Sequence, residues 1–204
     1  MGNLLTRRER EKYEKRREIL EAAKKVFARK GFNAATIDEI AELSEFSKGA
    51  IYIYFPNKEE LLIELLDTKI RELNDTIKEK TSRLTDPKKK IELHIDIILE
   101  FLDREKEVLQ ILHAEQSCFD PKTGNRLKEK VRGIYYEYYI EVYQIIKQGI
   151  KENIFKDINA DVLTISLIGM IQGFLLHYII ASTKYNILEM APMIKSIFFE
   201  GAAK

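Results

Sequence analysis

Residues 36–58, TIDEIAELSEFSKGAIYIYFPNK, constrain the fold of this chain more than any other segment. Helix-capping residues recur in it at short intervals, and each precedes residues that favour a helix: Thr36, Ser47 and Asn57. The stretch Ser44-Glu45-Phe46 interrupts the first helical pattern. We therefore predict two short helices, at about 36–43 and 47–55, joined by a tight turn and followed at once by a third helix.

The rest of the chain carries helix signals and lacks the alternation of a strand. Helix starts are expected at the T-x-x-E box of Thr6 and at Asp86-Pro87, and a stop is expected at Gly31. Hydrophobic residues make up 45% of the 204 residues, which is enough for a sizeable core. We predict an all-α chain of about nine helices. An N-terminal three-helix domain with a helix-turn-helix motif at about 36–55 would occupy residues 1–66, and a second helical domain residues 67–204.

The charges of the chain are unevenly distributed. The formal net charge is +1, but residues 1–30 hold eleven Lys or Arg against five Glu, so the remainder is mildly acidic. A basic cluster is typical of a surface that meets phosphates. Lys58 and the arginines at 7, 8 and 10 fall at predicted helix starts, where the dipole disfavours cations. We interpret them as partners of an external anion, and simple solvated charges are the alternative.

A helix-turn-helix unit suits the major groove of DNA, because a short helix held away from its neighbour can present side chains to base edges. The outward face of the predicted second helix carries Lys48, Gly49, Tyr52, Ile53 and Tyr54. Gly49 costs about 1 kcal/mol of helix stability relative to alanine. That cost is easier to explain if a phosphate backbone approaches the helix there. The sequence therefore predicts a DNA-binding protein.

The pattern F-x-x-A-T-x-x-x-I-A, followed by S-K-G-x-I-Y-x-Y-F-x-N-K-E-E-L-L, resembles the DNA-binding domain of the TetR/AcrR family of transcriptional regulators. The resemblance runs from about Tyr13 to Leu66. It implies contacts with double-stranded DNA, mostly with phosphates, at Thr36, Ser47, Lys48, Gly49, Tyr52, Tyr54 and Lys58. The family usually has Ala-Gly-Val where this chain has Ser44-Glu45-Phe46. A left-handed Glu45 would cost roughly 1 kcal/mol, unless the turn differs slightly.

The second part of the chain contains candidates for a ligand pocket. Tyr135, Tyr139 and Tyr143 share one face of a helix predicted at about 125–153, and they form either core aromatics or the wall of a pocket. The resemblance implies a small, partly apolar effector bound among the middle helices. The full set of candidate ligand-binding residues is His94, Phe101, His113, Gln116, Tyr135, Tyr139, Tyr143 and Gln172.

The last two predicted helices resemble the dimerisation bundle of the family. The spacing G-x-x-x-G at Gly169 allows two backbones to approach closely, and the alternative is that these helices only cover their own core. The candidate dimer-interface residues are Gly169, Gly173, Leu176, Met190, Ile194 and Phe198. A two-fold dimer predicts a palindromic operator with half-sites about one helical turn apart. The apolar run 162–181 approaches the length of a membrane span. We interpret it as a helix buried in a dimer, without a membrane.

No catalytic constellation is visible in the sequence. His94, His113 and His177 lack metal-ligand spacing, and Cys118 is the single cysteine, so we expect no enzyme activity, metal or cofactor and a cytoplasmic location. The favoured function is a ligand-responsive homodimeric repressor that releases its operator when a small molecule binds. The alternatives are a DNA-bound activator or chromosome-organising protein, and a small-molecule binder that has lost DNA function.

Overall fold

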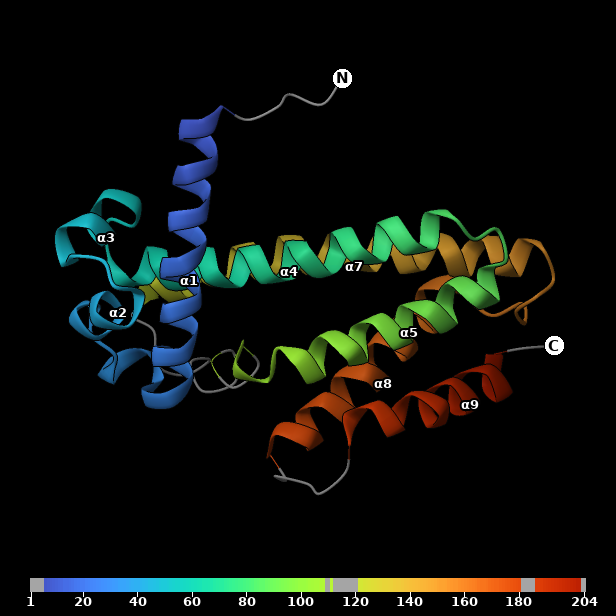
Figure 1. Ribbon diagram of the computed structural model, residues 1–204. Coiled ribbons are helices and arrows are strands. Elements are labelled where there is room, and N and C mark those ends of the chain that lie inside the picture. Colours follow the sequence, from blue (N-terminus) through green and yellow to red (C-terminus); the bar gives the residue numbers. More distant parts are fainter. Residues whose placement is uncertain (1–5, 109–110, 112–120, 181–185, 203–204) are drawn as a thin grey trace. The chain divides into compact units, whose positions relative to one another are not determined.

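The computed structural model describes residues 6–108, 111, 121–180 and 186–202, and the regular elements in those ranges are all helices (Figure 1). This confirms the all-α prediction, and nine helices with defined bounds match the expected number. Among the described residues they are α1 Arg7–Ala34, α2 Ile37–Ser44, α3 Lys48–Tyr54, α4 Lys58–Ser82, α5 Pro87–Arg104, α7 Pro121–Lys151, α8 Ala160–Ile180, the 3-10 helix η2 Ile187–Glu189 and α9 Met190–Ala202.

The chain forms two compact units. The first comprises residues 1–68 with 110–127, and the second comprises residues 69–109 with 128–204. The first unit therefore contains α1 to α3 and the start of α4, whereas the second contains the remainder of α4 together with α5, most of α7, α8 and α9. Each unit has its own buried core.

Local sequence signals start and stop the helices of the first unit. Thr6 caps α1, since its hydroxyl accepts a hydrogen bond from the N–H of Glu9 at 3.3 Å. Gly31, at φ +74°, breaks α1 in a conformation that residues with a Cβ rarely adopt. The first unit then buries one apolar face of each helix: Ile19, Ala23, Val26 and Phe27 from α1, Ile40 from α2, Ile51 from α3, and Leu61, Leu62 and Leu65 from α4.

The second unit is a layered helical bundle. Asp86 caps α5 by accepting from the N–H of Lys88 at 2.8 Å, and Pro87 occupies the first turn, where its missing N–H is harmless. In Figure 1, α5, α8 and α9 lie close together, and α5 and α8 each contact α9. Their core is continuous and includes Ile91, Ile95, Ile98, Leu102, Val142, Ile146, Leu167, Ile187, Ile194 and Phe198.

Helix α8 is apolar around its circumference, but only one side of it is buried. Leu163, Leu167 and Ile171 pack into the core of the second unit. The segment Ala160–Tyr178 is long and apolar enough to cross a membrane by length and composition, and 28% of it is buried within the chain. An exposed apolar side therefore remains on α8, and it bears on the assembly of the protein.

Candidate DNA-binding surface and other candidate sites

The N-terminus of α2 is capped by side chains of the protein itself. Thr36 accepts a hydrogen bond from the N–H of Glu39 at 3.3 Å, and the N–H of Thr36 donates to the Glu39 carboxylate at 3.1 Å. Lys30 also donates to that carboxylate. The hydrogen bond from Lys30 is the main cause that lowers the pKa of Glu39, followed by the bond from Thr36. Thr36 is exposed as a phosphate ligand would need to be, but its cap also explains its presence.

The turn between α2 and α3 uses a left-handed residue, as the family pattern requires. Glu45 has φ +59° and ψ +24°. Its N–H bonds to the carbonyl of Glu42 at 3.3 Å, and the N–H of Phe46 bonds to the carbonyl of Ala41 at 3.1 Å. This pair of bonds is a Schellman motif, which satisfies the last carbonyls of α2. The turn therefore keeps the left-handed geometry although Glu45 replaces glycine.

Helix α3 is short and mostly exposed. The Ser47 hydroxyl caps it by accepting from the N–H of Ala50 at 3.1 Å, and only Ile51 is buried along its length. Lys48 forms a 2.9 Å ion pair with Asp38 of α2, which raises the pKa of the lysine. A Cβ added at Gly49 would meet only the Ser47 hydroxyl, at 4.0 Å. No part of the described chain therefore explains Gly49 by close packing.

Arg16 of α1 anchors the far end of α3. Its guanidinium donates to the backbone carbonyl of Tyr54 at 3.1 Å and pairs with Glu64 of α4 at 3.1 Å. The same group lies 4.5 Å from the centre of the Phe55 ring. In the sequence Arg16 is only one charge of a basic segment, because its partners lie 38 and 48 residues further along the chain. No local signal marks it.

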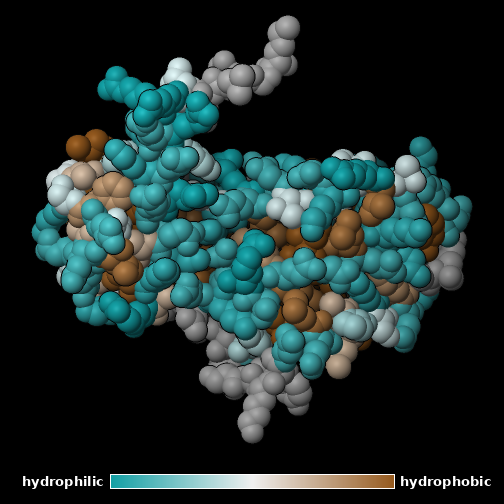
Figure 2. Space-filling view, in the orientation of Figure 1, coloured by the Kyte–Doolittle hydropathy of each residue, from teal (hydrophilic) through white to brown (hydrophobic). Residues whose placement is uncertain are grey.

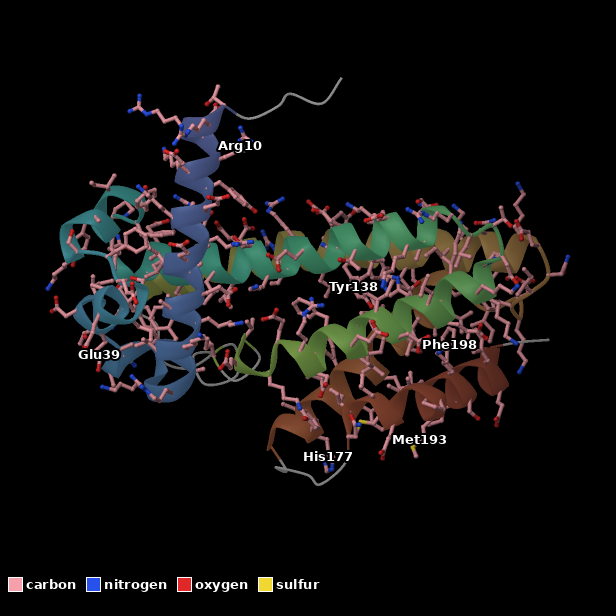
Figure 3. The ribbon with its side chains drawn as sticks, in the orientation of Figure 1. Arg10, Glu39, Tyr138, His177, Met193 and Phe198 are labelled. Carbon is pink, nitrogen blue, oxygen red and sulfur yellow. The ribbon has the colours of Figure 1, made fainter. Side chains whose placement is uncertain are left out.

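Lys58 has partners inside the first unit, which its position at a helix start does not reveal. Its ammonium donates to the backbone carbonyls of Phe32, Asn33 and Ala35 at 2.7, 3.2 and 2.8 Å, and it lies 4.5 Å from the centre of the Phe32 ring. These carbonyls terminate α1, and the negative end of a helix dipole favours a cation. An external anion is therefore not needed to explain this lysine. The arginines at 7, 8 and 10 remain exposed on α1, and Figure 3 shows Arg10 near its first turn.

The predicted ligand-binding residues that the structure describes do not line one common cavity. His94 and Phe101 of α5 are buried in the core of the second unit, whereas Gln172 is exposed on α8. The Tyr139 hydroxyl donates to Asp161, and its ring stacks on Tyr143 with centres 6.1 Å apart. Residues outside the described set are His113 and Gln116, together with the side chain of Tyr135.

His94 is nevertheless unusual, because it is fully buried and neither ring nitrogen has a hydrogen-bond partner among the described residues. Its ring centre lies 5.1 Å from that of Tyr138 (labelled in Figure 3). Burial lowers the pKa of His94 to about 4. An orphaned polar group of this kind is rare in folded proteins and calls for an explanation.

A groove of about 750 Å³ opens on the second unit. Its lining comes from α4, α5 and α7 and includes Lys78, Lys90, Glu141, Ile140 and Ile145. Burial raises the pKa of Glu141, and the charge of Lys78 opposes that shift. Figure 2 shows apolar side chains gathering between α5 and the second half of α4. The groove therefore combines cationic groups with an apolar lining.

Half of the predicted dimer-interface residues belong to the core of the chain instead. Met190, Ile194 and Phe198 are 7, 0 and 4% exposed, and they leave no surface for a partner. Figure 3 shows Phe198 on the side of α9 that faces α5, with Met193 on the opposite side. Gly169, Gly173 and Leu176 do lie on the exposed side of α8. Further exposed apolar residues on α8 and α9, which the sequence alone did not single out, are Val162, Ile165, Met193 and Ile197.

Two family models together match residues 19–201. The description "Bacterial regulatory proteins, tetR family" applies to residues 19–65, and "YsiA-like protein, C-terminal region" to residues 66–201. The chain belongs to the TetR family of transcriptional regulators. The predicted family is thereby confirmed, and with it a helix-turn-helix DNA-binding regulator as the general class of protein.

The curated relatives of this TetR-family chain match it only in part. The Bacillus subtilis regulator YuxN is 52% identical over 54 residues, which are 26% of this chain and 19% of YuxN. The activator FasR of Mycolicibacterium smegmatis is 26% identical over 127 residues, which are 62% of this chain and 56% of FasR. The chain thus spans less than two thirds of either relative.

Solved structures show the same fold over nearly the whole chain. The transcriptional regulator FadR of Bacillus subtilis, solved in complex with stearoyl-CoA, superposes with a TM-score of 0.79 at 22% identity. The superposition covers 91% of this chain and 98% of FadR. At this identity the likeness establishes the fold alone.

Proposed function

We propose that this chain is a homodimeric repressor that holds a palindromic operator and releases it when a small molecule binds. The observation that carries the proposal is that α3 is held at both ends and exposed on its outer face. The turn at Glu45 and the guanidinium of Arg16 hold its two ends, whereas Tyr52 and Ile53 on its outer face are 44 and 80% exposed. A fixed, exposed helix after a tight turn suits the major groove.

The exposed side of α8 supports the dimer. Its residues recur at helical spacing, and they are apolar or small: Val162, Ile165, Ser166, Gly169, Gly173 and Leu176. Met193 and Ile197 of the contacting α9 are 59 and 54% exposed. A surface of this kind is costly in water and is the typical core of an obligate interface. A second copy of the chain, related by a two-fold axis, would cover it and set the spacing of the half-sites.

The groove in the second unit supports an amphiphilic effector of the acyl-CoA class. FadR binds stearoyl-CoA according to its solved complex. In this chain Lys78 and Lys90 would meet phosphates of the ligand, and Ile140 and Ile145 would meet its acyl chain. His94 lies one helical turn beyond Lys90 on α5, so a polar group of a deeply bound ligand would satisfy its orphaned ring.

A binding titration tests the DNA-binding and effector parts of this proposal together. Duplex DNA from upstream of the gene would carry a fluorescent label, and its anisotropy would be followed at several salt concentrations. We expect specific, salt-sensitive binding by wild type, weaker binding by Tyr52→Ala, and release on addition of stearoyl-CoA but not of CoA alone. Equal binding by Tyr52→Ala and wild type would favour a protein that has lost DNA function. Lack of release by stearoyl-CoA would reject the effector class alone.

An activator is the second candidate, because FasR is named a transcriptional activator and matches this chain over a longer segment than YuxN does. Transcription in vitro from the bound promoter separates the two functions. A repressor lowers the yield of transcript in the absence of effector. An activator raises it.

A further inference from the structure

Ile53 is the most exposed large hydrophobic side chain in the part of the chain that the structure describes. It is 80% exposed on α3, against 44% for its neighbour Tyr52. Single exposed hydrophobic residues are common on protein surfaces. The position of Ile53 and the chemistry around it must therefore decide whether its exposure has a function.

Ile53 lies directly beside a bare stretch of helix backbone. Gly49 is four residues earlier, on the same face of α3, and side chains on a helix lean toward its N-terminus. The side chain of Ile53 thus extends toward Gly49, where a Cβ would meet only the Ser47 hydroxyl at 4.0 Å. The result is an exposed apolar side chain beside a stretch of helix backbone that carries no side chain of its own at Gly49.

Two polar groups near this site have partners in the first unit. The Ser47 hydroxyl accepts from the N–H of Ala50, and Lys48 pairs with Asp38. Ile53 itself can neither donate nor accept a hydrogen bond. Its contact with a base edge must therefore be apolar. Among the four bases in the major groove, the group that offers such a contact is the C5-methyl of thymine.

We propose that Ile53 is a specificity-determining residue that recognises the C5-methyl group of thymine in the major groove of the operator. The inference rests on the proposed DNA binding and adds to it which base is read and by which residue. One thymine methyl per half-site would lie against Ile53 above Gly49. Loss of one buried methyl group should weaken binding about fourfold, and loss in both half-sites about fifteenfold.

The test removes the methyl group from the DNA without changing any hydrogen bond. Full-length protein would first select a duplex from a random library. Variants of that duplex would then carry deoxyuridine in place of each thymidine in turn. Binding would be measured for wild type, Ile53→Ala, Ile53→Leu and the matched control Ile158→Ala, an exposed isoleucine of the second unit.

We expect at least one thymidine per half-site whose replacement weakens wild type and Ile158→Ala about fourfold. The same replacement should change binding by Ile53→Ala less than 1.5-fold, and Ile53→Leu should restore part of the sensitivity. Because Ile53 buries little surface, Ile53→Ala and Ile53→Leu should melt at the temperature of wild type.

Three results would overturn the inference. If every deoxyuridine duplex binds wild type as well as the parent duplex, or if Ile53→Ala keeps the full loss, methyl recognition by Ile53 is wrong although DNA binding stands. A change of sedimentation in Ile53→Ala without DNA would assign the residue to a protein contact instead. Failure to select any salt-sensitive duplex would reject the proposed function itself, and the inference with it.

Discussion

Replacement of Lys58 by methionine distinguishes an internal clamp from a phosphate ligand. The ammonium of Lys58 holds three backbone carbonyls at the end of α1 within 3.2 Å and lies over the Phe32 ring. Methionine keeps the length and the apolar stem of the side chain but removes its charge and donors. The substitution therefore isolates the contribution of the ammonium group.

The expected loss of stability follows from those contacts. A hydrogen bond from a charged donor contributes about 1.5–3 kcal/mol. The three bonds share a single half-buried ammonium, whose desolvation offsets part of the gain, so their contributions do not add. We expect Lys58→Met to lower the free energy of unfolding of the first unit by about 2 kcal/mol. A change of that size raises the equilibrium constant for opening of the first unit about 30-fold.

Hydrogen exchange by mass spectrometry measures this change in the whole protein. Backbone amides of α1, α2 and α4 in the first unit should exchange about 30-fold faster in Lys58→Met, whereas those of α5 and α9 should not change. Lys25→Met, which alters an exposed lysine of α1, is the control and should leave exchange unaltered.

The clamp would be refuted by unchanged exchange in Lys58→Met together with weaker DNA binding. A phosphate ligand should also lower the slope of log affinity against log salt concentration by about 0.9 for each lost contact. A purely internal clamp should leave that slope unaltered.

Three further predictions concern the second unit. Ile165→Lys places a charge on the exposed side of α8 and should convert the proposed dimer to a monomer in sedimentation experiments; a stable dimer would refute the interface. Wild type should lose stability as the pH falls from 6.5 to about 4, by roughly 3 kcal/mol, because the unfolded state binds the His94 proton first; urea titrations of His94→Leu should lack this loss. Gly149→Ala should destabilise the protein by about 1–3 kcal/mol in thermal melts, because its Cβ would lie 2.3 Å from the Phe155 ring. Gly133→Ala on the same helix has no neighbour within 4 Å and should not destabilise.

The helix starts could be predicted because a cap is a local event. Thr6, Thr36, Ser47 and Asp86 each accept a hydrogen bond from an N–H two or three residues ahead, so neighbouring letters specify the contact. The left-handed residue at Glu45 was expected from the resemblance instead, because the family usually has glycine at this position. These signals are sufficient to predict the helix-turn-helix of α2 and α3, which is the candidate DNA-binding element.

The faces of α9 could not be assigned from sequence, because apolar residues occur on both of them. Ile194 and Phe198 recur at the same helical spacing as Met193 and Ile197. The first pair is buried in the second unit, and the second pair is exposed. Periodicity identifies a helix and its faces, but only the packing of the other helices decides which face is inward.

The roles of the cations on the first unit required the three-dimensional structure for a related reason. A lysine at the start of α4 is unfavourable within its own helix, and this argument correctly predicts that Lys58 has a negative partner elsewhere. It does not identify that partner, which is the carbonyl end of α1, about 25 residues earlier. Arg16 makes a similar contact, since this cation of α1 binds the carbonyl end of α3. The two cations therefore join α1, α3 and α4 through helix ends. Four carbonyls at the ends of α1 and α3 are thus satisfied by basic residues of the first unit, and the outer face of α3 stays exposed.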